Sequence, residues 1–244
     1  MILVLGGTTE GRELCAALDR RGISNLQSLA GRTSNPLLTA SVRVGGFGGA
    51  EGLLRFLTER RVTTVVDATH PFAAGITRNA ALACAAAGVR LLRVDRPGWA
   101  KHPHADRWAW VDSHAAAAST VVALGSRRVL LTVGRQHTLD YSPALDDRYV
   151  LARAAEPPSA PLPPAWRLEL ARGPFSLAGE RRLFAEHQID SLITKDSGGD
   201  ATAAKLRVAD EANAAVVMLR RPAPPEGVVL LPDVAAALAL LSEG

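Results

Sequence analysis

Short apolar runs alternate with helix-forming stretches along most of this 244-residue chain. This alternation is typical of repeated βα units, in which helices connect the strands of a parallel sheet and cover its faces. The first half of the chain therefore predicts a series of such units. The expected strands are Ile2–Leu5, Asn25–Ala30, Val42–Val44, Thr64–Ala68 and Arg90–Val94, and the expected helices lie near Gly11–Arg21, Ala50–Arg60 and Ala74–Ala87.

The pattern pauses after Arg96 in a loop rich in proline and tryptophan, and then begins again. We place a domain boundary there, with residues 1–96 in one domain and 97–244 in a second. The segment Glu156–Trp166 has five prolines in eleven residues and predicts a linker or surface loop, because proline disrupts helices and central strands. The second half predicts strands at Arg128–Val133, Tyr149–Ala152, Ser191–Thr194 and Val216–Leu219, and helices at Ser113–Leu124, Ser176–His187, Thr202–Ala214 and Asp233–Leu241.

These elements predict an α/β fold with two Rossmann-like parallel-sheet domains that face a shared crevice. Ligands of such folds bind outside the carboxyl ends of the strands. The residues that follow each strand are therefore the candidates for function.

The charge of the chain favours a small acidic ligand over nucleic acid. The net charge is +4 and the pI is near 9.6, but the basic residues are scattered in ones and twos. Aromatic residues make up only 5% of the chain, which leaves no visible stacking surface for bases. We therefore expect no nucleic-acid partner.

The sequence also predicts neither a membrane segment nor a metal site. No apolar run approaches the roughly 18 residues of a membrane helix, and glycines end the first apolar run too early for an export signal. Cys15 and Cys84 lie far apart in alanine-rich helical stretches, without the close Cys/His pairing of a zinc site. We expect both to be reduced core residues of a cytoplasmic protein.

The first strand leads into the turn Gly6-Gly7-Thr8-Thr9-Glu10-Gly11. This turn matches the dinucleotide fingerprint Gly-x-Gly-x-x-Gly at its first and third glycines, with Thr8 at the second. The helix that follows presents free N–H groups and a partial positive charge to a pyrophosphate. The alternative is a plain turn in which Thr9 caps the helix and no ligand binds.

The residues after the second strand predict which dinucleotide binds. NAD enzymes have an Asp or Glu there, about 20 residues after the glycines, whereas this chain has Gly31-Arg32-Thr33. The Arg32 guanidinium and the Thr33 hydroxyl and N–H are suited to the 2′-phosphate of NADP. The sequence therefore predicts NADP, unless Arg32 is one of many solvated arginines.

Two further segments of the first domain follow strands and are candidates for the cofactor side. The strand Thr64–Ala68 is followed by Thr69-His70-Pro71, and His70 is a candidate proton donor or a helix-capping side chain. Gly46 lies in a glycine-rich loop that either lets the backbone approach a ligand or is a plain turn.

The second domain has a similar polar turn, Thr194-Lys195-Asp196-Ser197-Gly198-Gly199, followed by a helix with Thr202 and Lys205. Backbone N–H groups, Ser197 and Lys195 predict a cradle for a carboxylate or phosphate. Arg135, which follows another strand, adds a basic group. Walker-type phosphate binding and hydrolase motifs are not found in the sequence, so a bound cofactor is expected to supply the chemistry, with hydride transfer as the natural candidate.

Together these blocks resemble the precorrin-6A (precorrin-6x) reductases of cobalamin (vitamin B12) biosynthesis over nearly the whole chain. The resemblance implies NADPH-dependent reduction of one double bond of a tetrapyrrole rich in carboxylates, giving precorrin-6B or its cobalt-bearing counterpart. It implies that Thr8, Arg32 and His70 lie on the cofactor side, and that Lys195, Asp196 and Ser197 lie on the substrate side. It also suggests His70 or Asp196 as proton donor and neighbouring cobalamin-pathway enzymes as partners. The blocks are Gly6–Gly11, Gly31-Arg32, Asp67–Ala73, Arg96-Pro97, Gly173-Pro174-Phe175 and Thr194–Gly199 with Thr202 and Lys205.

Two other functions stay open from the sequence. One is a different NADP-dependent reductase or epimerase on the same scaffold, because a fold alone does not determine the substrate. The other is a nucleotide-sensing module that binds nucleic acid through its basic surface.

Overall fold

The computed structural model describes residues 1–30 and 41–242, which form two compact units. Unit 1 comprises Met1–Pro97 together with Pro222–Gly244, and unit 2 comprises Gly98–Arg221. The predicted boundary is therefore within two residues of the first crossing. The prediction nevertheless put the C-terminal segment in the second domain, whereas its strand and helix pack in unit 1.

Unit 1 contains a six-stranded sheet in the order β12-β5-β4-β1-β2-β3, in which every neighbouring pair is parallel. Read from β3, the order is that of a dinucleotide-binding doubly wound fold, with β12 as the sixth strand. The strands are β1 (Ile2–Leu5), β2 (Asn25–Leu29), β3 (Val42–Val44), β4 (Thr64–Asp67), β5 (Arg90–Val94) and β12 (Val229–Leu231).

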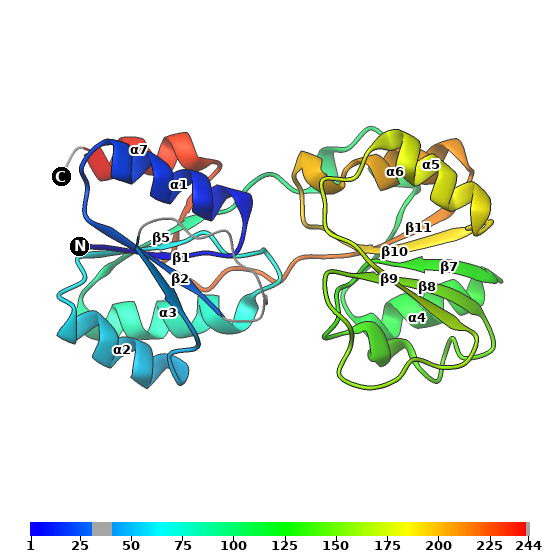
Figure 1. The fold of residues 1–244 in the computed structure, drawn as a ribbon, viewed down its shortest axis with the longest axis horizontal. Coiled ribbons are helices and arrows are strands. Elements are labelled where there is room, and N and C mark those ends of the chain that lie inside the picture. The colour runs from blue at the N-terminus through cyan, green and yellow to red at the C-terminus, as the bar shows by residue number, and fades with distance from the viewer. Residues whose placement is uncertain (31–40, 243–244) are drawn as a thin grey trace. The chain divides into compact units, whose positions relative to one another are not determined.

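Alternate residues of β1 reach the two helical layers of unit 1, because successive side chains of a strand point to opposite faces. Ile2 and Val4 pack in one core cluster with residues of α1 and α7, and Leu3 and Leu5 pack in another with residues of α2 and α3. The two pairs of helices accordingly cover opposite faces of the sheet (Figure 1). Their bounds are α1 (Thr9–Arg20), α2 (Gly49–Glu59), α3 (Ala74–Ala87) and α7 (Val234–Ser242).

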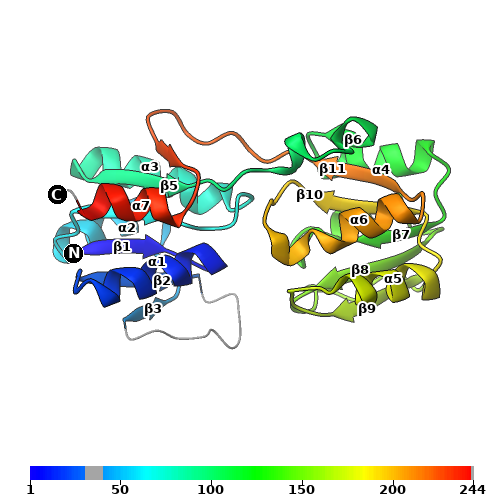
Figure 2. The ribbon, with the colours of Figure 1, turned by 90° about the horizontal axis from the view of Figure 1, so that it is seen from above.

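Unit 2 repeats this plan with a second six-stranded parallel sheet, in the order β6-β11-β10-β7-β8-β9 (Figure 2). One face is covered by α5 and α6 around the core residues Leu130, Leu183 and Leu192, and α4 covers the other (Figure 1). The elements are β6 (Ala109–Val111), α4 (His114–Ala123), β7 (Arg128–Leu131), β8 (Tyr149–Ala154), β9 (Trp166–Leu170), α5 (Leu177–Glu186), β10 (Ser191–Lys195), α6 (Ala204–Glu211) and β11 (Ala215–Leu219). Four short 3-10 helices complete the described chain: η1 (Trp99–Lys101), η2 (Ala105–Arg107), η3 (Thr138–Tyr141) and η4 (Asp200–Thr202).

The strand order places the candidate residues of each unit. In unit 1 the order reverses between β1 and β4, so the glycine turn and the Thr69–Pro71 segment follow neighbouring strands. In unit 2 the corresponding pair is β7 and β10, which are followed by Arg135 and by the Lys195–Ser197 turn. Ligands of doubly wound folds bind at such reversal points.

The described helices are too short to span a membrane. Within residues 1–30 and 41–242 the longest helix, α3, has 14 residues, and none is long and apolar enough to cross a bilayer.

Candidate functional site

The glycine turn of unit 1 is tied to the end of the neighbouring strand by Thr8. The Thr8 hydroxyl donates to the Ala68 carbonyl at 2.7 Å and accepts from the Gly11 N–H at 3.2 Å. Thr8, rather than Thr9, is therefore the N-cap of α1. The second position of the fingerprint thus carries a side chain that holds the turn against the segment after β4.

The glycines of this turn are required by two different constraints. A Cβ at Gly6 would lie 2.7 Å from the Nε2 of Gln27, and a Cβ at Gly11 would lie 3.1 Å from the Gly6 Cα. Gly7 has a φ of +116°, which residues with side chains rarely adopt, and it is exposed. The result is a tight strand-to-helix turn with no side chain in front of its backbone at Gly7, which suits the approach of a pyrophosphate.

Glu10 begins α1 with a charge that is already paired. Its carboxylate lies 2.6 Å from the Arg96 guanidinium, and about one fifth of each side chain is exposed. Burial acts to raise the pKa of Glu10, but the hydrogen bond and charge of Arg96 outweigh it and lower the pKa. Glu10 therefore links the glycine turn to the segment after β5. Thr9 is exposed and accepts a hydrogen bond from Arg12 at 3.1 Å.

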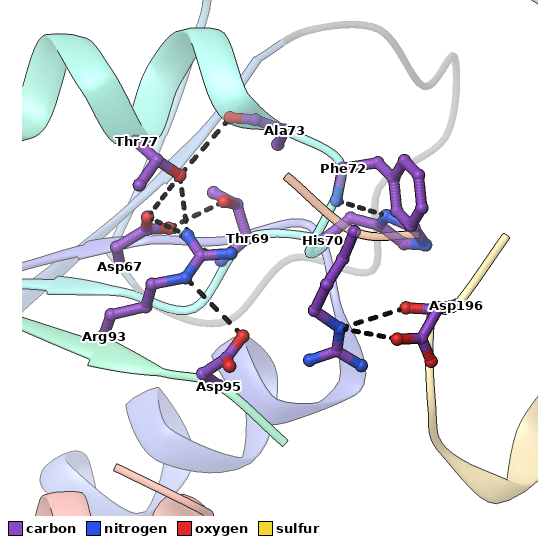
Figure 3. A network of polar contacts seen from close by, with 10 residues as sticks. Asp67, Thr69, His70, Phe72, Ala73, Thr77, Arg93, Asp95 and Asp196 are labelled. Carbon is purple, nitrogen blue, oxygen red and sulfur yellow. Dashed lines mark hydrogen bonds and ion pairs between the residues drawn. The ribbon is translucent and has the colours of Figure 1, made fainter. Parts of the chain in front are cut away.

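A buried polar network holds the segment after β4 (Figure 3). The Asp67 carboxylate, which is fully buried, pairs with Arg93 and accepts from the hydroxyls of Thr69 at 2.6 Å and Thr77 at 2.7 Å. Its Oδ1 also accepts from the Thr69 N–H at 3.0 Å. Asp67 is thus saturated by its own unit, and it positions Thr69 at the carboxyl edge of the sheet.

The next residues along this segment are partly accessible. His70 is half-buried, and its Nδ1 accepts from the Phe72 N–H at 3.1 Å, so Nε2 carries the proton of the neutral ring. Pro71 is buried. Gly46, beyond β3, is exposed, and its carbonyl accepts from Arg43 at 2.7 Å. Arg32 and Thr33, on which the cofactor preference depends, lie outside the described residues.

In unit 2 the polar turn after β10 is anchored by Asp196, which is 7% exposed. Its carboxylate accepts from the Trp99 N–H at 2.6 Å and pairs with Arg221 at 3.3 Å. The Ser197 N–H donates to the Lys195 carbonyl at 2.6 Å, and Gly198 follows with a φ of +62°. The turn is therefore held as a compact loop beside β11.

Two lysines bring buried charge to this edge. Lys195 is the last residue of β10, and burial lowers its pKa to about 8. Lys205, in the first turn of α6, is 7% exposed, and burial together with the charge of Arg153 lowers its pKa to about 7, against the opposing effect of Glu180. No hydrogen bond or ion pair of the Lys205 ammonium is found among the described residues. Such a group is suited to an anionic ligand.

The remaining predicted residues of unit 2 differ in their surroundings. Arg135 pairs with Glu156 at 2.9 Å, and Glu156 also pairs with Arg172 at 3.2 Å, so the Arg135 charge is shared with the protein. Thr202 is half-buried at the end of η4. The two predicted catalytic residues lie in different units, His70 in unit 1 and Asp196 in unit 2.

Comparison with known proteins shows which family this chain belongs to. A family model described as Precorrin-6x reductase CbiJ/CobK matches residues 1–242. The chain belongs to the precorrin-6x reductase family. A precorrin-6A reductase of Rhodococcus erythropolis is 46% identical over 240 residues, which cover 98% of this chain and 96% of that protein. A solved structure named CobK precorrin-6A reductase has a TM-score of 0.91 at 38% identity and covers 99% of this chain and 96% of its own.

A cobalt-precorrin-6A reductase of Salmonella typhimurium is more distant, at 28% identity over 243 residues, covering 91% of this chain and 88% of that protein. The precorrin-6x reductase family comprises oxidoreductases that act on a CH–CH group in cobalamin biosynthesis. The predicted family, the oxidoreductase class and the two parallel-sheet α/β domains are thereby confirmed.

Several polar residues near the candidate site were not predicted from the sequence. Gln27 of β2 is fully buried against Gly6, and Arg221 pairs with Asp196. A second group, His114, His137 and Asp140, brings its nitrogen and carboxylate atoms within 4.8 Å of one another in unit 2. The signal for His137 was its position after β7, in the same polar run as Arg135.

Proposed function

We propose that this chain reduces one double bond of precorrin-6A with NADPH and gives precorrin-6B. The observation that carries the proposal is a pyrophosphate-type turn at the strand reversal of unit 1, in a chain of the precorrin-6x reductase family. Bound NADPH would supply the hydride.

The turn of unit 1 fits a dinucleotide by its own geometry. Gly6 and Gly11 leave no room for a side chain, and Gly7 exposes the backbone at the positive end of α1. We assign the pyrophosphate to Gly6–Gly11 and the 2′-phosphate to Arg32 and Thr33. Gly46, Thr69, His70 and Pro71 are assigned to the rest of the cofactor.

The edge of unit 2 is assigned to the acidic substrate. Lys205 is buried and Lys195 is half-buried, and an acetate or propionate carboxylate of the macrocycle would give the Lys205 ammonium the acceptor that the described chain does not supply. Ser197 and Gly198 would add hydroxyl and N–H donors. Arg135 and Thr202 complete the proposed set.

The two catalytic candidates are assigned different roles by their contacts. We assign His70 the role of a ring donor to cofactor or substrate, because its Nδ1 accepts from the Phe72 N–H and the neutral ring therefore carries its proton on Nε2. Asp196 pairs with Arg221 and accepts from Trp99, so we assign it the role of orienting the substrate loop as a carboxylate.

We further propose the metal-free macrocycle as the substrate. The relative named precorrin-6A reductase is 46% identical, whereas the one named cobalt-precorrin-6A reductase is 28% identical. We also propose that the protein works in the cytoplasm with neighbouring enzymes of the cobalamin pathway, because a shared intermediate connects them.

The decisive experiment mixes the purified protein with NADPH and precorrin-6A and follows the macrocycle by mass spectrometry. We expect a product about two mass units heavier, with loss of the NADPH absorbance. A parallel reaction with NADH tests the cofactor, and one with cobalt-precorrin-6A tests the metal. Turnover of small carbonyl compounds with no change in precorrin-6A would overturn the proposal.

A further inference from the structure

A histidine pair lies at the carboxyl edge of unit 2, beside the proposed substrate residues. His114 begins α4 after β6, and His137 precedes η3 after β7. Their imidazole rings stack with centroids 4.3 Å apart and planes 15° apart. The charge of Lys195 acts on His114, which connects the pair to the turn after β10.

The two histidines are held by different partners. The Nδ1 of His114 lies 2.9 Å from the hydroxyl of Tyr141, which is fully buried. The Nδ1 of His137 lies 2.8 Å from the Asp140 carboxylate, and nearly half of each of these two side chains is exposed. Because a carboxylate accepts hydrogen bonds, this contact assigns an N–H to Nδ1 of His137 and turns Nε2 away from Asp140.

The surroundings keep His114 neutral. Burial lowers the pKa of His114 to about 4, the charges of His137 and Lys195 act in the same direction, and Asp140 opposes them. His114 is therefore a neutral imidazole near pH 7, and its contact with Tyr141 holds it in place. His137 is the accessible ring of the pair: its side chain is nearly half exposed, it is oriented by the Asp140 carboxylate, and it stacks on His114.

We propose that His137 is the general acid of the reduction, with Asp140 as its orienting residue. This inference rests on the proposed function, because hydride addition to one carbon of the double bond requires a proton at the neighbouring carbon. The step starts from the imidazolium form of His137, in which Nδ1–H donates to Asp140 and Nε2 also carries a proton. The Nε2–H bond breaks and a C–H bond forms, which leaves a neutral imidazole, while NADPH is oxidised and the macrocycle is reduced. Solvent then returns a proton to His137, which its exposure permits.

The same atoms suit a metal ion less well. Stacked rings do not direct two nitrogen lone pairs at one point, and the ammonium of Lys195 repels a cation at this place. Metal binding nevertheless has a distinct signature, so titration with Zn²⁺ and Co²⁺ belongs in the test.

The test compares His137→Gln and Asp140→Asn with the wild type, using NADPH and precorrin-6A over a range of pH. We expect His137→Gln to lower kcat by about a hundredfold or more and to remove the loss of rate on the basic side, with unchanged NADPH affinity. Asp140→Asn should lower kcat by about tenfold and keep the basic limb. Added imidazole should restore part of the rate of His137→Ala, which a purely structural role would not allow.

His187→Gln is the matched control. His187 also contacts a tyrosine, with its Nδ1 2.7 Å from the Tyr149 hydroxyl and its ring stacked on that tyrosine, but it follows α5 at the opposite edge of the sheet. This control should retain the wild-type pH profile. Unchanged kinetics in His137→Gln, or stoichiometric metal binding that depends on His137, would overturn the inference while the proposed function stands. No reduction of precorrin-6A by the wild type would overturn both.

Discussion

The carboxyl edges of the two sheets share a strand order but hold buried charge differently. In unit 1 the Asp67 carboxylate is saturated by Arg93, Thr69 and Thr77. In unit 2 the ammonium of Lys205, which is also buried, has no hydrogen bond or ion pair among the described residues. Removing one partner of a saturated buried charge is strongly destabilising, whereas an unsaturated buried charge itself costs stability and favours a ligand of opposite charge.

The largest loss of unfolding free energy is expected when the charge of the saturated Asp67 carboxylate is removed. Asp67→Asn removes the partner of Arg93 and leaves that cation buried, which should cost about 3–5 kcal/mol of unfolding free energy. Asp95→Asn is the control, because Asp95 lies 3.7 Å from Arg93 and is more exposed. Urea unfolding measures both, and equal losses would show that Arg93 does not depend on Asp67.

Removal of the unsaturated Lys205 charge should change the unfolding free energy in the opposite direction. Lys205→Met should increase stability at pH 7, and it should lower kcat/KM for precorrin-6A by about a hundredfold with unchanged NADPH affinity. The exposed Lys101→Met is the control. A destabilised Lys205→Met protein with full activity would show that Lys205 supports the fold and not the substrate.

The pH dependence of stability gives an independent test of Lys205. Its pKa is about 7 in the folded protein and 10.5 in the unfolded reference, so between these values the unfolded chain binds more protons. Stability should therefore rise with pH across this window in the wild type. In Lys205→Met most of this rise should disappear, which urea unfolding at pH 7 and 9 would measure.

A smaller effect, on NADPH affinity, is expected from a substitution on the proposed cofactor side. Arg32→Ala should weaken NADPH binding by about ten- to a hundredfold and change NADH binding little, because the proposed partner of the guanidinium is the 2′-phosphate, which NADH lacks. Fluorescence titration with both dinucleotides measures the difference. Equal losses for the two would remove Arg32 from the 2′-phosphate site.

The smallest predicted effect concerns the glycine turn itself. Gly6→Ala places a Cβ 2.7 Å from Gln27 Nε2, and the flexible amide can give way in part, so we expect about a tenfold loss of NADPH affinity. Gly75→Ala is the control, since a Cβ there meets nothing within 4 Å. Equal affinities of the two variants would show that the turn tolerates a side chain at its first glycine.

The sequence predicted the central elements well, because they carry strong apolar patterns. The strand Ile2–Leu5 and the helix Ala74–Ala87 have the predicted bounds, and β4 and β10 differ by one residue. The strands β6, β9 and β12 were not predicted. They are edge strands, and β9 alternates Arg167 and Glu169 with apolar residues of which only Trp166 is buried, so it lacks the continuous apolar run of the central strands.

The candidate site was predictable where a motif follows a strand, and less so where pairing depends on the fold. Gly6 and Thr8 follow β1, Lys195 ends β10, and Asp196 comes directly after it, so all four lie where buried strands end at the reversal points. Arg221 is distant in sequence from its partner Asp196, and His114 is distant from His137. No local sequence pattern predicts either contact. Only the parallel register of the strands brings them together.

The return of the chain to unit 1 has a consequence for biosynthesis. Translation proceeds from the N-terminus, so β12 and α7 emerge only after the whole of unit 2 has been made. Until then β5 presents an unpaired edge, and the α1 face of the sheet lacks the cover of α7. Unit 1 of a growing chain therefore stays unfinished on the ribosome while unit 2 can already fold.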